Sequence, residues 1–498
     1  MHIVFREKHG LEENEAPIDL DQSPADLAVL SFSDSDLGAF AEGWHRGKSF
    51  LPSLRLANLA TLKHPLSVDT YIEKTLSSAR GILIRLIGGK PYWPYGIQQI
   101  NYLAKARGIA LAVLPADGRL DTQLDAASTV PLSTLRQLSM LCQEGGPVAA
   151  QAALAQLSLS AGIYAKPILE KKNLPKVGAW TANQGIICPA KIKLKEIQKP
   201  LAVISFYRSF LSAADLAPIK EINYALIKQG LEVVGLFVQS LKNQEDARWI
   251  ERQLRALKPK VIVNATAFSG IGPDGKSPLD IAGAPVFQVA LATSTKKAWS
   301  SAVRGLSPTD LAMHVVLPEV DGRIFAGVAS FKQAGKKDTL LEFSRFAHHP
   351  EKERVTALSA RISAHVSLQN KLPVEKVTAL ILSTYPGKNW QMGHAVGLDA
   401  LASANSILHA LSDEGYDINF PQKLEKELSE SFALFCLKSY KNLLKELPTK
   451  LQTSLFDTWG EPEADPLCKN QKFQFKCLVC GKAYIALQPE RGEINDRK

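Results

Sequence analysis

Val263-Asn264-Ala265-Thr266-Ala267-Phe268-Ser269 lies within residues 201–332, the most informative part of the chain. Around it, short runs rich in β-branched residues alternate with helical patterns. The runs predicted as strands are Leu201–Phe206, Leu231–Phe237, Val261–Val263 and Pro285–Val289, and the helices predicted between them are Asp215–Gln229 and Asn243–Leu257. Such alternation is typical of a parallel α/β sheet with crossover helices.

Polar residues follow three of these predicted strands. They are Tyr207 and Arg208, then Asn264–Ser269, then Ala290–Thr295. Ligands of parallel α/β sheets bind outside the carboxyl ends of the strands. The sequence therefore predicts one continuous polar rim that binds a ligand.

Composition sets the broad class of the protein. With 498 residues, 46% of them hydrophobic, the chain can bury several cores, and two to four domains are expected. No apolar run approaches the roughly 18 residues of a membrane span, and residues 1–14 are charged without an apolar signal core, so we expect a cytoplasmic protein without a membrane partner. Six irregularly spaced cysteines indicate free thiols rather than a disulfide framework.

The predicted fold class is α/β, with tandem Rossmann-like or flavodoxin-like parallel-sheet domains and helical insertions. We expect an N-terminal α/β domain over 1–165, a linker over 166–200, a second α/β domain over 201–345, and the start of a third, mixed α/β domain over 346–498. The predicted linker holds eight lysines and four prolines. It contributes to the net charge of +10, but it has almost no aromatic residues for base stacking, so a solvated linker is favoured over a nucleic-acid surface.

Gly270–Ser277 fits the phosphate-loop pattern G-x-x-x-x-G-K-S, but its surroundings do not. Ala265–Ser269 separates it from the preceding strand, and Pro278, Gly283 and Pro285 leave room for about one helical turn. We therefore predict a surface turn. The alternative, an ATPase, predicts that Lys276→Ala abolishes nucleotide binding.

Other motifs give weaker indications of a site. Cys477 and Cys480 have the inner spacing of a zinc knuckle without a second ligand pair, and a strand pair over 473–485 is favoured. His348 and His349 are predicted to be an exposed helix cap. The turn with Glu319, Asp321 and Arg323 is equally compatible with ligand binding and with an internal salt bridge. No metal site is assigned, and the weak candidates are His314 and His394.

Several longer phrases resemble one protein family. They include Phe206-Tyr207-Arg208, Asn264-Ala265-Thr266-Ala267-Phe268, Arg304-Gly305-Leu306-Ser307-Pro308 and Leu317-Pro318-Glu319-Val320-Asp321-Gly322-Arg323, with Trp459-Gly460 and Val396-Gly397-Leu398-Asp399 further along. Together they resemble the family of CobN, the large subunit of aerobic cobaltochelatase, with the magnesium chelatase H subunit as a more distant relative. The resemblance extends over the whole chain.

The resemblance implies the ATP-dependent insertion of cobalt, as a substrate ion, into hydrogenobyrinic acid a,c-diamide during cobalamin synthesis. In this family the large subunit holds the tetrapyrrole, and AAA+ subunits of the CobS and CobT type use ATP and magnesium. The residues expected to bind substrate are Arg208, Asn264, Thr266, Ser269, Gln288, Ser294, Thr295, Arg304, Glu319 and Arg323. Arg208 and Arg323 would meet substrate carboxylates or amides, and the catalytic residue is unassigned.

The chain also departs from the family pattern. Family members are more than twice as long, and the motif His-Gly-x-x-Glu-Trp-Leu-Pro-Gly of their second half is not found here. We therefore expect an N-terminal part that binds substrate weakly and does not turn over alone. Histidine replaces the family's asparagine at His314 and His394, which weakens the case for ligand binding there. The alternatives are a scaffold or degenerate fragment that docks the AAA+ subunits, and a large subunit of the magnesium chelatase type.

Overall fold

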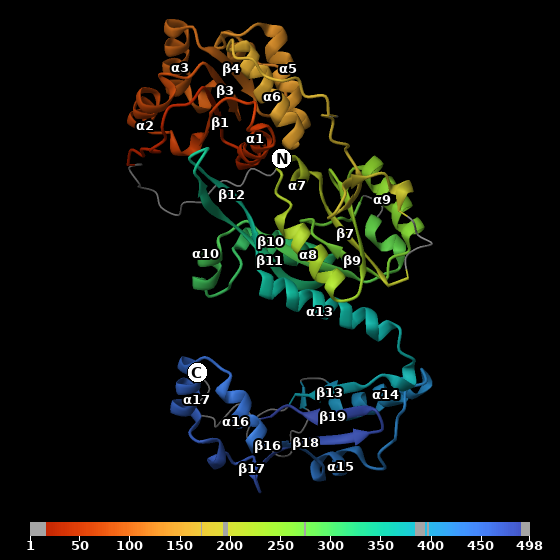
Figure 1. Ribbon diagram of the computed structural model, residues 1–498. Coiled ribbons are helices and arrows are strands. Elements are labelled where there is room, and N and C mark those ends of the chain that lie inside the picture. Colours follow the sequence, from red (N-terminus) through yellow and green to blue (C-terminus); the bar gives the residue numbers. More distant parts are fainter. Residues whose placement is uncertain are drawn as a thin grey trace. The chain divides into compact units, whose positions relative to one another are not determined.

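The structure is a computed structural model that describes residues 16–170, 172–192, 198–272, 275–383, 394–395 and 398–489. The chain forms two compact units, Met1–Val366 and Ser367–Lys498 (Figure 1). Among these residues, the first unit contains two separate sheets, of four and eight strands, and the second unit contains a five-stranded sheet and a two-stranded one.

The first sheet is parallel and has the strand order β2-β1-β3-β4. Its strands are β1 (Leu27–Ser31), β2 (Leu54–Asn58), β3 (Gly81–Leu86) and β4 (Ala110–Pro115). One face is covered by α1 (Asp34–Gly47), α5 (Leu132–Glu144) and α6 (Gly146–Ser160). The other face is covered by α2 (Pro65–Tyr71), α3 (Pro94–Arg107) and α4 (Thr122–Ala126). The strands are buried on both faces, which explains why they read as continuous apolar runs.

The second sheet has eight strands in the order β12-β11-β10-β9-β7-β8-β5-β6. Its parallel part comprises β7 (Leu201–Tyr207), β8 (Glu232–Val238), β9 (Val261–Asn264), β10 (Val286–Ala292) and β11 (Ile324–Asp338). Helices α8 (Ala217–Lys228) and α13 (Lys352–Gln369) cover one face, and α9 (Gln244–Leu257) covers the other. Both sheets have the flavodoxin-like order, in which the first strand lies between the second and third. The predicted fold class is confirmed.

The segment predicted as a linker contributes two strands to this sheet. These are β5 (Gly178–Thr181) and β6 (Gly185–Ile187), and β5 pairs antiparallel with β8. Trp180 is 1% exposed and meets the ring of Phe206 edge-on at 5.9 Å. The sequence did not predict this short apolar strand because it lies among lysines and prolines. The strand pairs with the edge of β8 that would otherwise be open.

Helix α13 also lies differently from its predicted place at the start of a third domain. Its apolar side chains Val355, Leu358, Ile362 and Val366 are buried in the core of the second sheet. The division between the compact units therefore follows Val366 instead of residue 345.

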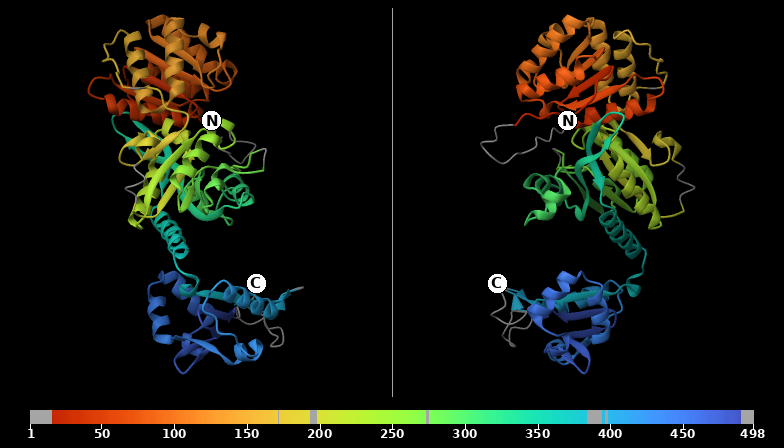
Figure 2. Two further views of the ribbon diagram at one scale, coloured as in Figure 1. Left: turned by 90° about the vertical axis from the view of Figure 1, so that its right-hand side faces the viewer. Right: turned by 60° about the vertical axis from the view of Figure 1, so that its left-hand side comes forward.

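An arm connects the two sheets of the first unit. It is formed by the ends of β11 and of β12 (Phe343–Pro350), and it reaches the first sheet (Figure 2). At its tip, Leu341 is fully buried in the core beside β1 and β2. The Glu342 carboxylate accepts hydrogen bonds from Arg55 at 2.9 Å and from the Ser23 hydroxyl at 2.6 Å. The arm thus joins the second sheet to the first through both apolar and charged contacts.

The second unit has a sheet with the order β13-β19-β18-β16. Its strands are β13 (Thr378–Leu382), β16 (Phe432–Cys436), β18 (Lys472–Cys480) and β19 (Ala483–Leu487), and the short β17 (Cys468–Lys469) pairs with β18. Its helices are α14 (Ala400–Asp413), α15 (Leu424–Glu430), α16 (Leu437–Lys445) and α17 (Thr449–Trp459). The strand pair predicted over 473–485 exists as β18 and β19, and its turn lies at Gly481, which has a φ of 66°. Across the described ranges, no helix is long and apolar enough to cross a membrane.

Candidate functional site

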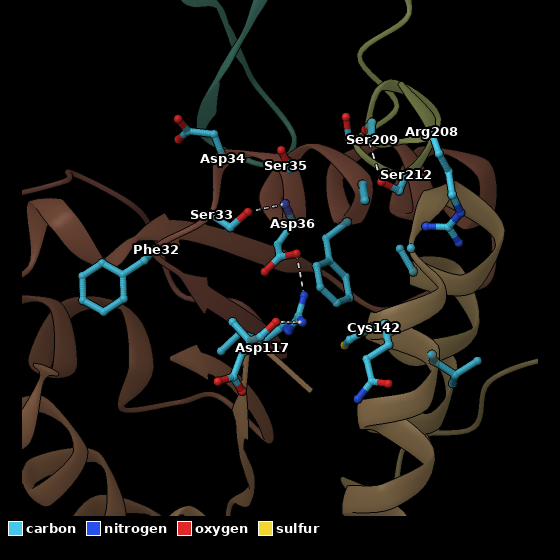
Figure 3. Close-up of a pocket in the computed structure, with 18 of the residues that line it drawn as sticks. Phe32, Ser33, Asp34, Ser35, Asp36, Asp117, Cys142, Arg208, Ser209 and Ser212 are labelled. Carbon is cyan, nitrogen blue, oxygen red and sulfur yellow. Dashed lines mark hydrogen bonds and ion pairs between the residues drawn. The ribbon is translucent and has the colours of Figure 1, made fainter. Parts of the chain in front are cut away.

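A pocket of about 420 Å³ lies between the two sheets of the first unit. We call it the inter-sheet pocket. Its walls come from the carboxyl ends of strands in both sheets, because residues after β1, β4, β7 and β8 all line it (Figure 3). The lining includes Phe32, Ser33, Asp34, Ser35, Asp36, Arg85, Asp117, Cys142, Gln143, Arg208, Ser209, Ser212, Gln239 and Lys332. Ligand sites of α/β proteins are found at this end of the strands, and the volume suits a small ligand or part of a larger one.

The wall from the first sheet is built around Asp36. The side chain of Ser33 caps α1 by accepting a hydrogen bond from the Asp36 backbone N–H at 3.2 Å. The Asp36 carboxylate accepts from the Ser31 hydroxyl at 2.9 Å and pairs with Arg85 at 2.5 Å. Burial works against the charge of Arg85, but Asp36 outweighs it and raises the Arg85 pKa. Burial also raises the pKa of the neighbouring Cys142 thiol to about 11, so that this thiol stays protonated at neutral pH.

The wall from the second sheet carries two cations. Arg208 opens the short helix α7 (Arg208–Ser212) and donates hydrogen bonds to the carbonyls of Glu144 at 2.9 Å, Leu174 at 3.0 Å and Pro175 at 3.1 Å. Burial lowers its pKa, and Glu144 offsets only part of that effect. Lys332 Nζ lies 3.7 Å from Asp34 of the opposite wall. The guanidinium of Arg208 is thus fixed by backbone carbonyls, whereas Lys332 spans the pocket.

The inter-sheet pocket combines both charge signs with hydroxyl and amide groups. Asp34, Asp36 and Asp117 supply carboxylates, while Arg85, Arg208 and Lys332 supply cations. Such a lining can bind a ligand that carries both acceptors and donors. Among the residues that the structure describes, no group of three or more histidine, cysteine or acidic side chains is placed to hold a metal ion.

The predicted rim of the second sheet is largely closed by its own hydrogen bonds. Asn264 and Gln288 are 3% and 1% exposed, and the Asn264 amide donates to Gln288 Oε1 at 2.7 Å. Asn264 Oδ1 accepts from the hydroxyls of Ser205 at 2.6 Å and Thr266 at 2.8 Å. Gln288 in turn donates to the Thr266 carbonyl at 2.7 Å. These residues join β7, β9 and β10 inside the fold and do not line the inter-sheet pocket.

Two further predicted residues, Ser269 and Ser294, donate hydrogen bonds to aspartates. Asp321 accepts from the Ser269 hydroxyl at 2.6 Å, and Asp310 accepts from the Ser294 hydroxyl at 2.9 Å. Burial opposes the charge of Asp310, but hydrogen bonds from Thr293 and Ser294 and the nearby His314 lower its pKa. These polar groups of the predicted rim therefore form hydrogen bonds with other residues of the same chain.

The remaining predicted residues have separate locations. Arg323 is 7% exposed and pairs with Asp280, which lies outside the turn that holds Glu319 and Asp321. Thr295 caps α10 (Lys296–Ser301), while Arg304 and Glu319 are exposed. Of the ten predicted substrate-binding residues, Arg208 is the one among the residues lining the inter-sheet pocket.

The histidine predictions have mixed outcomes. His314 is buried beside Asp310. His394 lies in β14 (His394–Ala395), and the neighbouring residues 384–393 and 396–397 lie outside the described residues. The prediction of an exposed cap at His348 was wrong, because His348 Nδ1 lies 2.8 Å from Asp215 and the side chain is 12% exposed. Here the β12 strand continues through His348 and brings it against the loop before α8.

The structure around two sequence motifs, Gly270–Ser277 and Cys477 with Cys480, argues against the sites that their patterns suggest. A 3₁₀ helix over Pro278–Ala282 follows the Gly270–Ser277 segment, of which Pro273 and Asp274 lie outside the described residues. No α-helix therefore opens at Lys276-Ser277, as a phosphate loop would require. Cys477 and Cys480 lie three residues apart on β18, which directs their side chains to opposite faces of the sheet.

Sequence reasoning missed most of the lining of the inter-sheet pocket. Phe32-Ser33-Asp34-Ser35-Asp36 directly follows the apolar run Leu27–Ser31, which is the same signal that was used for the second sheet. The contribution of Lys332 had no such signal, because it lies within β11 rather than after a strand.

Comparisons with known proteins show the family. A sequence model of the CobN/Magnesium Chelatase family matches residues 140–498. The chain is 30% identical to the aerobic cobaltochelatase subunit CobN of Sinorhizobium sp over 525 aligned residues, which cover 100% of this chain and 41% of that protein. It is also 30% identical to the subunit of the same name from Pseudomonas aeruginosa, over 99% of this chain and 41% of the relative.

Similarity to a solved structure supports the fold. The catalytic subunit of cobaltochelatase from Mycobacterium tuberculosis superposes with a TM-score of 0.71 at 23% identity, over 94% of this chain and 39% of that one. This chain thus spans about two fifths of the length of these relatives. The family match over residues 140–498 leads to one conclusion: the chain belongs to the CobN/magnesium chelatase family.

Proposed function

We propose that this chain is the tetrapyrrole-binding, N-terminal part of a cobaltochelatase large subunit. Its role is to hold hydrogenobyrinic acid a,c-diamide while cobalt, the substrate ion, is inserted during cobalamin synthesis. The observation that carries this proposal is the 30% identity to two aerobic cobaltochelatase subunits over essentially the entire chain.

The chemistry of the inter-sheet pocket supports a role in holding this substrate. Hydrogenobyrinic acid a,c-diamide carries both carboxylate and amide arms on its macrocycle. Arg208 and Lys332 suit the carboxylates, whereas Asp34, Asp117 and the serine hydroxyls suit the amide N–H groups. We propose that the pocket receives peripheral arms of the macrocycle.

The ten residues expected from the sequence take different parts in this proposal. Arg208 contacts the substrate directly. The buried network of Asn264, Thr266 and Gln288 fixes the carboxyl ends of β7, β9 and β10, from which α7 and the neighbouring loops extend. Contact of the macrocycle with the outer rim would involve the exposed Arg304 and Glu319, with Ser269, Ser294, Thr295 and Arg323 positioning the loops.

Absorbance titration tests substrate binding. Hydrogenobyrinic acid a,c-diamide is titrated with the purified chain at low and at moderate salt. We expect a saturable spectral shift whose midpoint rises with salt, because the proposed contacts include ion pairs. A spectrum that stays unchanged at every chain concentration would reject the proposed binding.

Cobalt insertion is proposed to need further polypeptides. AAA+ subunits of the CobS and CobT type would supply ATP hydrolysis with magnesium, and the rest of the large subunit would supply the catalytic group. The chain mixed with only those ATPase subunits, ATP and cobalt is expected to give no cobalt-corrinoid absorbance. Turnover in that mixture would show that the catalytic group lies in this chain.

Two other functions remain as alternatives. The extensive contacts within the rim would also suit a scaffold that docks ATPase subunits, and such a scaffold predicts ATPase binding without corrinoid binding. A magnesium chelatase-type subunit is less favoured, because rice magnesium-chelatase subunit ChlH is 24% identical over 61% of the chain. Cytoplasmic location is proposed along with the cobaltochelatase role.

A further inference from the structure

The sheet of the second unit has one face covered by helices. Register pairs Leu380 with Ile485 and Ile485 with Leu478, so these three side chains lie in a row on the same face. They pack in one apolar cluster with Leu408 of α14 and Leu428 of α15. Helices α14 and α15 therefore cover this face.

The opposite face carries an equally apolar row. Register pairs Ala379 with Tyr484 and Tyr484 with Val479, and Ile381 lies two residues beyond Ala379 on the same face. Ile381 is 63% exposed, Val479 57% and Tyr484 40%. Within the described ranges of the chain, these side chains have no helix over them comparable to α14 or α15. We call Ile381, Val479 and Tyr484 the bare face.

The bare face ends where α16 begins to cover the sheet. Further along β18, Phe473 lies on the same side as Val479 and is only 7% exposed. Its ring meets that of Tyr440 on α16 at 5.0 Å. One end of this apolar surface is thus packed against α16, whereas Ile381, Val479 and Tyr484 at the other end are exposed.

An exposed apolar row on a sheet is unusual for a surface that faces water. Sheets with one solvated face normally alternate apolar and polar residues, and contiguous apolar patches mark sites of protein contact. Here both faces are apolar, which is the pattern of a sheet covered on both sides.

We propose that the bare face docks the polypeptide that corresponds to the unmatched part of the CobN relatives. The chain spans 41% of both curated CobN relatives, so more than half of their length has no counterpart in it. The family match includes the second unit, which makes this sheet part of the family fold rather than an addition to it. The proposal does not depend on corrinoid binding, which is tested separately.

Binding of that polypeptide to the purified full chain tests the proposal. The probe is the part of the Sinorhizobium CobN sequence outside the match, produced as a separate polypeptide. The test variants are Ile381→Asp and Val479→Lys, which place charges on the bare face. The control is Tyr102→Asp, which changes a large exposed side chain of the first unit at 75% exposure. Circular dichroism establishes that all three variants are folded.

The unmodified chain and the Tyr102 variant are expected to bind the probe with dissociation constants within twofold of each other. Each bare-face variant is expected to bind about tenfold or more weakly, as substitutions at the centre of an apolar interface do. Failure of the unmodified chain to bind the probe would overturn the proposal, as would unchanged binding by both bare-face variants. Self-association of the unmodified chain that Val479→Lys abolishes would assign the bare face to a second copy instead.

Discussion

Asn264 is the centre of a buried hydrogen-bond network that fixes the carboxyl ends of three strands. Its Oδ1 accepts from Ser205 and Thr266, and its amide donates to Gln288. Replacing Asn264 by alanine leaves these buried groups without their partner, and each such group costs about 1–3 kcal/mol. We expect Asn264→Ala to lower the unfolding free energy by about 3 kcal/mol in urea titration.

The matched control for this loss is Ser300→Ala. Ser300 is exposed on α10, and its hydroxyl donates a hydrogen bond to the Lys297 carbonyl of its own helix. This substitution is expected to change the unfolding free energy by less than about 0.5 kcal/mol. If Asn264→Ala lowers the unfolding free energy no more than the control does, the network does not stabilise the carboxyl ends of the three strands.

Two cysteines should differ in reactivity. Burial raises the pKa of Cys142 to about 11, whereas backbone N–H groups of Ser439 and Lys438 lower the pKa of the exposed Cys436 below its ordinary value of 9.0. The thiolate is the reactive form, so iodoacetamide at pH 7.5 should label Cys436 first and leave Cys142 unlabelled in the folded chain. Peptide mass spectrometry measures both sites. Equal labelling rates would contradict this arrangement of the pocket wall.

At the level of single residues, sequence reasoning identified polar groups after strands but not their partners. Ser269 and Ser294 do follow strands, yet their hydroxyls donate to Asp321 and Asp310, which lie 52 and 16 residues further along the chain. A single sequence shows which residues end a strand, but it does not show which loop folds back over them. Arg208 was predicted because it directly follows a buried strand. Asp34 and Asp36 come shortly after another buried strand, so the same signal could have identified them.

Among the elements, the arm formed by β11 and β12 links the two sheets of the first unit. Hydrogen bonds from Ser23 and the charge of Arg55 lower the pKa of Glu342. Burial opposes ionisation of Asp338, but the backbone N–H of Leu341 and the side chain of His45 outweigh it and lower the Asp338 pKa. Both carboxylates therefore favour the docked arm in their charged form.

The arm contacts should therefore weaken in acid. A carboxylate with a lowered pKa contributes stability above its ordinary value, here 4.5 for Glu342 and 3.8 for Asp338, and loses it as the pH falls through the folded value. We expect the unfolding free energy of the chain to fall between about pH 4.5 and pH 2, and to fall less in the double variant Glu342→Gln and Asp338→Asn. Urea titrations at stepped pH measure this. Parallel pH profiles for both proteins would exclude a contribution from these two carboxylates.

Long periodic elements were predictable, and short edge elements were not. The buried strands β7 to β10 and helix α9 were found because an apolar run or a repeating apolar face persists over many residues. Strands β5 and β6 are three or four residues long and lie among lysines and prolines, so their own sequence does not indicate that β5 pairs with the edge of β8. Helix α13 was found, but its partner sheet was not, because amphipathicity does not identify which core accepts the apolar face.

On the scale of the whole molecule, the two compact units should unfold separately. Calorimetry of the chain is expected to show two transitions, because each unit has its own cluster of buried residues in the part of the chain that the structure describes. Ile362→Ala creates a cavity in the core of the second sheet, and such losses cost about 2–5 kcal/mol. It should lower one transition temperature and leave the other unchanged. A shift of both transitions would show that α13 stabilises both units.

Binding of the tetrapyrrole in the inter-sheet pocket is best tested with one pair of variants. Ser209 lines the pocket and Ser300 does not, yet both are exposed serines in short helices. Hydrogenobyrinic acid a,c-diamide is titrated by absorbance with the unmodified chain, with Ser209→Phe and with Ser300→Phe. We predict that Ser209→Phe weakens binding at least about tenfold and that Ser300→Phe binds like the unmodified chain. Equal binding by all three proteins would contradict the assignment of the tetrapyrrole to this pocket.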